Sequence, residues 1–64
     1  MLSEERLEHL KSLNDEVRMM MFFSEKLDNV DLQTEENELA ETLKLVVEQC
    51  SRIEMKVRKF RKEF

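Results

Sequence analysis

The sequence contains no glycine and no proline among its 64 residues. Both residues interrupt helices, and glycine also builds the tight turns and loops that hold phosphate groups. Their absence favours uninterrupted helices and argues against a nucleotide-binding loop. The longest apolar run, Met19–Phe23, has only five residues. Because a transmembrane helix needs roughly 20 apolar residues, we expect no membrane span.

Cysteine and histidine each occur once, as Cys50 and His9. One cysteine cannot form an intramolecular disulfide, and the two residues together fall short of the four ligands of a structural zinc site. We therefore expect no metal and no cofactor. A single free thiol suits a reducing compartment, which predicts a cytoplasmic protein. The acidic start, Met1–Glu5, predicts neither a secretory signal nor a transit peptide.

The residues with potential chemistry do not form a catalytic arrangement. His9 has Ser12 as its only nearby hydroxyl, which favours an isolated surface histidine. Cys50 stands in an apolar stripe, where cysteine usually serves as a small buried hydrophobic residue. The acidic clusters at 28–31 and 35–38 lack the glycine and the twelfth-position glutamate of an EF-hand. We expect a protein that is not an enzyme.

Charge is distributed unevenly along the chain, whose net charge is −4. Residues 1–28 carry four basic and seven acidic side chains, residues 29–51 carry one and six, and residues 52–64 carry six and two. A basic helix C-terminus complements the helix dipole, although phosphates or anionic lipids are an alternative partner for this segment. Because the chain is acidic overall, we expect no nucleic-acid binding.

A heptad pattern dominates the second half of the sequence. Apolar residues recur with alternating gaps of four and three, whereas a strand would alternate every second residue. This pattern predicts one apolar stripe along an α-helix that packs against other helices. The stripe consists of Leu39, Leu43, Val46, Cys50, Ile53, Val57, Phe60 and Phe64.

A first amphipathic helix is predicted over about residues 3–28. Ser3 is a favourable N-cap, and Glu4 and Glu5 place negative charge in the first turn, where the helix dipole favours it. The residues that share its inward face are Leu10, Leu13, Val17, Met20, Ser24 and Leu27.

The one plausible break lies at about residues 29–34. Asn29 tolerates the left-handed conformation that ends many helices, and Thr34 is a second candidate N-cap. We therefore predict a second helix over about 35–63 and an all-α fold, an antiparallel helical hairpin. The alternative is one continuous coiled-coil helix, because asparagine and aspartate alone break a helix weakly.

Two such helices carry more apolar surface than they can bury against each other. Met19–Phe23 covers more than one helix face, and Leu45 and Met55 lie off the stripe. We expect the hairpin to dimerise into a four-helix bundle, or to dock onto a larger helical protein partner. The predicted interface residues are Leu10, Val17, Met20, Phe22, Phe23, Leu27, Leu39, Leu43, Val46, Cys50, Ile53, Val57 and Phe60.

Three stretches resemble the first two helices of GAT domains, which occur in GGA clathrin adaptors and Target-of-Myb proteins. They are Leu10–Met20 and the pair Glu38–Leu43 and Glu48–Ile53, and the resemblance covers roughly residues 10–57. It implies a three-helix bundle that binds ubiquitin. The sequence has neither the upstream segment that contacts small GTPases of the Arf class nor a third helix, so Arf binding is not implied. The matching ubiquitin-facing positions are Met20, Phe23, Leu27 and Leu39.

The sequence therefore predicts a non-enzymatic helical module for protein–protein interaction or oligomerisation. The alternatives are a trafficking adaptor fragment that binds ubiquitin and a small regulatory protein that acts by binding a partner. We expect aspartate at Val46 or Ile53 to abolish association, because it would bury an unpaired charge.

Overall fold

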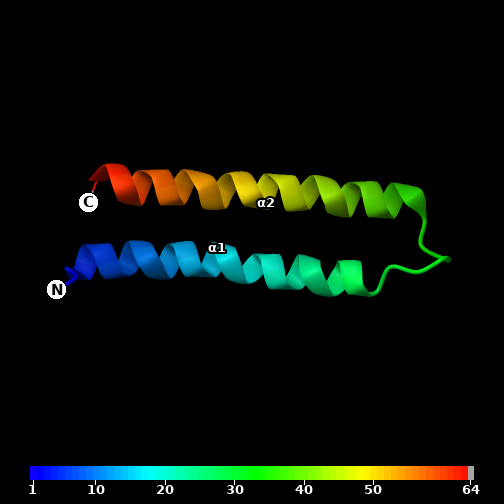
Figure 1. Cartoon of the computed structure of the whole chain (residues 1–64), viewed down its shortest axis with the longest axis horizontal. Coiled ribbons are helices and arrows are strands. Elements are labelled where there is room, and N and C mark those ends of the chain that lie inside the picture. The colour runs from blue at the N-terminus through cyan, green and yellow to red at the C-terminus, as the bar shows by residue number, and fades with distance from the viewer. Residues whose placement is uncertain (64) are drawn as a thin grey trace.

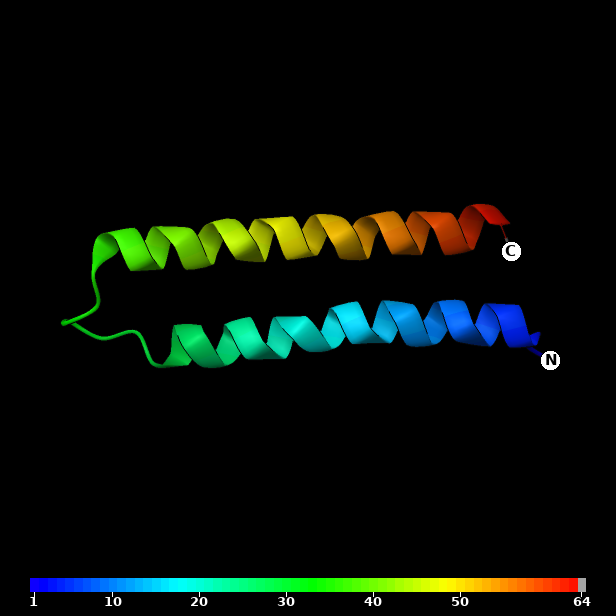
Figure 2. The same ribbon diagram turned by 180° about the vertical axis from the view of Figure 1, so that it is seen from behind.

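The chain folds into two helices joined by a short connection, as seen in a computed structural model that describes residues 1–63. Helix α1 spans Glu4–Asp28 and helix α2 spans Glu36–Glu63. The helices run antiparallel and lie side by side, with the start of α1 and the end of α2 at the same end (Figure 1 and Figure 2). The predicted hairpin is confirmed, and the alternative of one continuous helix is wrong.

Helix α1 begins and ends through local hydrogen bonds. Ser3 has an extended backbone, and its hydroxyl accepts a hydrogen bond from the Arg6 N–H at 3.1 Å, so the predicted N-cap is confirmed. At the other end, the Asn29 N–H bonds to the carbonyls of Glu25 and Lys26. The backbone of Asn29 has φ −91° and ψ 0°, so it ends the helix without the expected left-handed conformation.

The connection is organised around Asp31 and Thr34. The Thr34 hydroxyl accepts from the Asp31 N–H at 3.0 Å, and the Asp31 carboxylate accepts from the Gln33 N–H at 2.8 Å. These bonds hold Thr34 within the connection, and α2 begins two residues later, at Glu36. The prediction of Thr34 as the N-cap of the second helix is therefore wrong, and the connection runs over residues 29–35.

The space between the helices holds little fully buried surface, because two helices side by side shield only one flank of each other. Phe23, 7% exposed, is the one buried apolar residue in the described part of the chain. Most other apolar side chains that face the opposite helix are half-buried. They are Leu10, Leu13, Met20, Leu39, Val46, Ile53, Val57 and Phe60. Phe64, the last residue of the predicted stripe, lies outside the described residues.

The accessible surface of the hairpin is large for its mass. It measures 5,724 Å², whereas a compact monomer of 7.8 kDa exposes about 4,400 Å² by the usual scaling with mass. The excess of about 1,300 Å² reflects the two-helix architecture, which covers one side of each amphipathic helix and leaves the rest open.

Candidate interaction surface

Helix α2 turns only half of its predicted stripe toward α1. Leu39, Val46, Ile53 and Phe60 are half-buried against α1, whereas Leu43 and Cys50 are exposed to one side of them. Leu43 is 47% exposed. The places nearest α1 between the half-buried residues belong instead to Thr42, Gln49 and Lys56.

The cause is the geometry of the heptad. At about 100° per residue, Leu43 lies about 40° from Leu39 on one side, and Thr42 lies about 60° from it on the other. One neighbouring helix cannot cover both sides, so the stripe is divided. Cys50 is exposed for this reason, and the expectation that it is buried is wrong for the hairpin.

The apolar stripe of α1 is divided in the same way, with some of its residues against α2 and others exposed. Leu13 and Met20 are half-buried, whereas Val17 is 45% exposed and Ser24 is also exposed. The side chains of Glu16 and Phe23 take their places next to α2.

One broad face of the hairpin carries a polar network centred on Glu16, which we call the polar face. The buried Gln49 side chain donates through Nε2 to the Glu16 backbone carbonyl at 2.8 Å and to its carboxylate at 3.3 Å. The Arg52 Nε donates to the same carboxylate at 3.0 Å. Lys56 lies 3.8 Å from the other carboxylate oxygen and donates to the Ser12 hydroxyl at 2.7 Å.

This network shifts the titration of Glu16. The hydrogen bond from Arg52 is the main cause that lowers the pKa of the Glu16 carboxyl below its ordinary value of 4.5. Partial burial opposes the shift by raising the pKa, and the charges of Arg52 and Lys56 reinforce it. The ionised carboxylate is therefore the form that the network stabilises, and it ties both helices together at one level.

Sequence reasoning missed this network. The partners of its members depend on how the two helices are aligned, which local sequence patterns do not give. The available signal was the spacing of Thr42, Gln49 and Lys56, which recur every seven residues on α2 beside the apolar stripe.

The opposite broad face is mostly apolar and lacks a covering element, and we call it the open face. Seen from one end of the hairpin, the two antiparallel helices wind in opposite directions. Residues displaced in the same rotational sense from the inward side of each helix therefore lie on the same broad face of the hairpin. Ser12 and Glu16 lie toward one flank of α1, and Arg52 and Lys56 lie toward the matching flank of α2. The bonds between these residues define the polar face. Residues on the other flank form the open face, and two of them, Leu10 and Val57, are half-buried at its edge next to the opposite helix. The full set is Leu10, Asn14, Val17, Met21 and Ser24 from α1, and Leu43, Val47, Cys50, Glu54 and Val57 from α2.

The open face combines high exposure with little charge. Val17 and Leu43 are nearly half exposed, and Met21 and Val47 are 67% and 66% exposed. Glu54 is the one charged residue among its ten positions, and its carboxylate pairs with Arg58 on the same helix at 2.6 Å. The centre of this face therefore presents apolar and small polar side chains to its surroundings.

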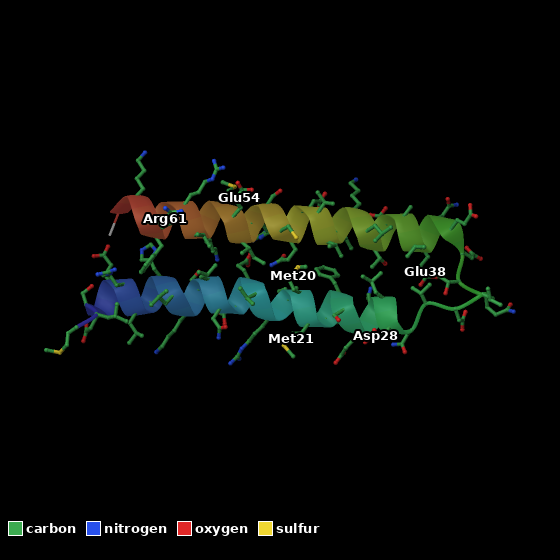
Figure 3. The ribbon with its side chains drawn as sticks, in the orientation of Figure 1. Met20, Met21, Asp28, Glu38, Glu54 and Arg61 are labelled. Atoms are coloured by element: carbon green, nitrogen blue, oxygen red, sulfur yellow. The ribbon has the colours of Figure 1, made fainter. Side chains whose placement is uncertain are left out.

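The Met19–Phe23 cluster is distributed around α1. Met20 points toward α2 and Met21 points away from it (Figure 3). The Phe22 ring is 52% exposed and lies edge-on to Phe23, with centroids 5.8 Å apart, and the Lys26 ammonium lies 5.1 Å from the centroid of Phe22. Phe22 is thus partly covered by its own helix, and it lies outside both the contact between the helices and the open face.

A shallow cleft of about 460 Å³ on the side of the polar face is lined by Arg52, Met55, Lys56 and Lys59. Two smaller clefts lie on the same side. One, of about 330 Å³, is next to the connection, where Lys26, Thr34 and Glu38 contribute to its walls. The other, of about 220 Å³, is lined by Glu8, His9, Ser12, Lys56 and Lys59. Within residues 1–63, no three histidine, cysteine or acidic side chains come together as ligands for a metal ion. In the same residues, neither helix has the length and apolar character needed to cross a membrane.

The four positions matched to the ubiquitin-facing surface of GAT domains lie mainly between the two helices. Phe23 is buried, Met20 and Leu39 are half-buried, and Leu27 is 37% exposed. A comparison of the chain with protein-family models, curated proteins and solved structures finds no match. The resemblance therefore stays a prediction, and the proposed function is argued from the open face.

Proposed function

We propose that this protein is a non-enzymatic helical interaction module that acts through its open face. The observation that carries the proposal is the division of both apolar stripes, which leaves Val17 on α1 and Leu43 on α2 nearly half exposed. Next to them, Met21 and Val47 are also exposed. Contiguous apolar patches on small proteins mark binding surfaces, since exposing them to water is unfavourable.

The spacing of the open face indicates a helical partner. Leu43, Cys50 and Val57 recur every seven residues on α2, and Leu10, Val17 and Ser24 do so on α1. Helices that pack side by side in bundles present knobs at this interval to the groove of a neighbouring helix. A helix or helical hairpin laid over the open face would bury the uncovered half of each stripe.

The polar face suits the solvent-facing side of such an assembly. The charged groups at its centre are paired within the chain, because the Glu16 carboxylate contacts both Arg52 and Lys56. Covering these charges with another protein would remove their water without providing new partners. The two faces thus support binding on one side only.

Photo-crosslinking tests the proposal. Benzophenone attached to Cys50, on the open face, is irradiated in an extract of the source cells that also contains the free protein. The control carries the same group at Met55→Cys in a Cys50→Ser chain, because Met55 is 70% exposed and points away from the open face. We expect covalent products of defined mass from Cys50 only. Equal products from both positions, or none from Cys50, would contradict the proposal.

The sequence-based choice of Val46→Asp and Ile53→Asp serves this purpose poorly. Both side chains are half-buried between α1 and α2, so a charge there would break the hairpin itself. Leu43→Asp is the better variant, because Leu43 contributes to the open face.

A further inference from the structure

We propose that the open face is covered by a second copy of the chain, with the connection of each hairpin over the open end of the other. The product is an antiparallel four-helix bundle with a twofold axis across its middle. This inference rests on the proposed function, because it names the partner of the same face.

The size of the open face fits a dimer of this chain. The Cα atoms of the hairpin extend over 50 × 16 × 9 Å, so each broad face has a plan area of about 800 Å². Stable protein interfaces bury about 800 Å² on each partner. The surface excess of about 1,300 Å² over a compact monomer is sufficient for such a contact.

The charges at the two ends of the hairpin are opposite. The connection end, residues 25–41, carries seven acidic and one basic side chain, a net charge of −6. The open end, residues 1–13 and 52–64, carries eight basic and five acidic side chains, a net charge of +3. A second copy with its connection at the same end would bring −6 against −6, whereas the reversed copy brings −6 against +3.

This difference decides the orientation. Charges at the rims of an interface are screened over about 8 Å at physiological ionic strength, but stacked helices lie only about 8–10 Å apart. Like charges held at that distance disfavour an arrangement, and electrostatics of this kind sets orientation more than affinity. The charge asymmetry therefore selects the reversed orientation.

The hairpin also has its stripe centred at its middle, as a twofold axis requires. Glu16 is the central residue of α1, and Gln49 and Cys50 are the two central residues of α2. The hydrogen bonds between Glu16 and Gln49 bring these midpoints to the same level.

The residues of the open face are spaced evenly about that level. Leu43 and Val57 each lie seven residues from Cys50, and Leu10 and Ser24 each lie seven residues from Val17. Rotation about the axis would place Leu43 of one copy opposite Val57 of the other, and Cys50 opposite Cys50. An isologous contact needs such self-complementarity.

Light scattering and pulsed electron paramagnetic resonance test the inference on the full chain. The wild type is expected to have the mass of two chains at micromolar concentration. Nitroxide is attached at Leu32→Cys in a Cys50→Ser chain, because Leu32 lies at the tip of the connection and is fully exposed. In the reversed dimer the two labels lie at opposite ends, about 50 Å apart given the length of the hairpin. In a same-end dimer they lie within about 20 Å, because stacked helices are about 10 Å apart.

Variants on the two faces provide the matched control. Leu43→Asp should weaken dimerisation at least about 100-fold while helicity is retained, since the twofold axis buries the new charge twice. Met55→Asp should leave the dimer unchanged, because Met55 lies outside the open face.

Each failure has a distinct meaning. A wild-type mass of one chain at every concentration overturns the second-copy proposal, and a dimer with a short Leu32 label distance overturns its orientation. If the mass is that of one chain while benzophenone at Cys50 still forms adducts with another protein, the proposed function stands and this inference fails. If benzophenone at Cys50 forms no adduct of any mass, both fail.

Discussion

The polar face and the open face belong to the same two helices, yet they differ in how their side chains are paired. On the polar face, Gln49, Arg52 and Lys56 all bond to Glu16 or Ser12 across the hairpin. On the open face, Val17 and Leu43 remain nearly half exposed. The polar face thus aligns the two helices with each other, and the open face is the one to which we assign association.

The difference also explains why the heptad pattern is regular although α1 covers only part of it. A helix in a bundle contacts two neighbours, so its apolar stripe points between them. Leu39 and Val46 face the neighbour in the same chain, and Leu43 and Cys50 are exposed beside them, where the proposed second neighbour would lie.

The largest effect is expected from Phe23, the buried residue between the two faces. Phe23→Ala should lower the free energy of unfolding by about 3–5 kcal/mol, because it removes a buried ring and leaves a cavity. Since a small helical domain has a total stability of a similar size, the variant should be largely unfolded at room temperature. Circular dichroism at 222 nm during urea and thermal unfolding measures this loss.

Phe22→Ala is the matched control for that substitution. Its ring is half exposed, so we expect a loss of about 1 kcal/mol or less. Equal destabilisation by the two variants would contradict the assignment of Phe23 to the contact between the helices and of Phe22 to the exposed surface.

A smaller effect is expected from Gln49, which aligns the two helices on the polar face. Gln49→Ala should reduce the free energy of unfolding by about 1–2 kcal/mol, because it removes two hydrogen bonds from a buried side chain. The adjacent Glu48 is exposed, and Glu48→Ala should change stability by less than about 0.5 kcal/mol. Urea unfolding of both variants provides the comparison, and similar midpoints for the two would count against the network.

The sequence predicts the two helices but not the contacts between them. The helices and their approximate ends were predictable, because Ser3, Glu4 and the three–four spacing are local signals. The role of Gln49 was not, since it depends on the alignment of residues 33 positions apart in sequence. Thr34 was misassigned because its hydroxyl bonds to Asp31 rather than to the start of α2.

The open face was only partly predictable for a related reason. The pattern places Leu39, Leu43, Val46 and Cys50 on one stripe, but it does not say which residues of that stripe meet the neighbour in the same chain. That choice depends on the rotation of α2 about its axis, which the contacts with α1 determine.

The smallest effect concerns pH and again distinguishes the two faces. The pKa of Glu16 is lowered by Arg52 in the folded chain, so its contribution to stability is present above the ordinary value of 4.5. It is lost as the pH falls through the lowered pKa, because the unfolded chain then binds the proton more tightly. Wild type should therefore lose more stability than Glu16→Gln between pH 5 and pH 3, as measured by urea unfolding. Parallel pH profiles of the two proteins would remove Glu16 from the network.

The central claim is that the open face is covered in the associated protein and the polar face is not, and the reactivity of Cys50 tests it most directly. The rate of Cys50 alkylation by iodoacetamide is measured over a range of protein concentrations, with Met55→Cys in a Cys50→Ser chain as the reference. We predict that the rate constant for Cys50 falls as the concentration rises, while that for Met55→Cys stays constant. A Cys50 rate constant that equals the reference at every concentration would contradict the claim.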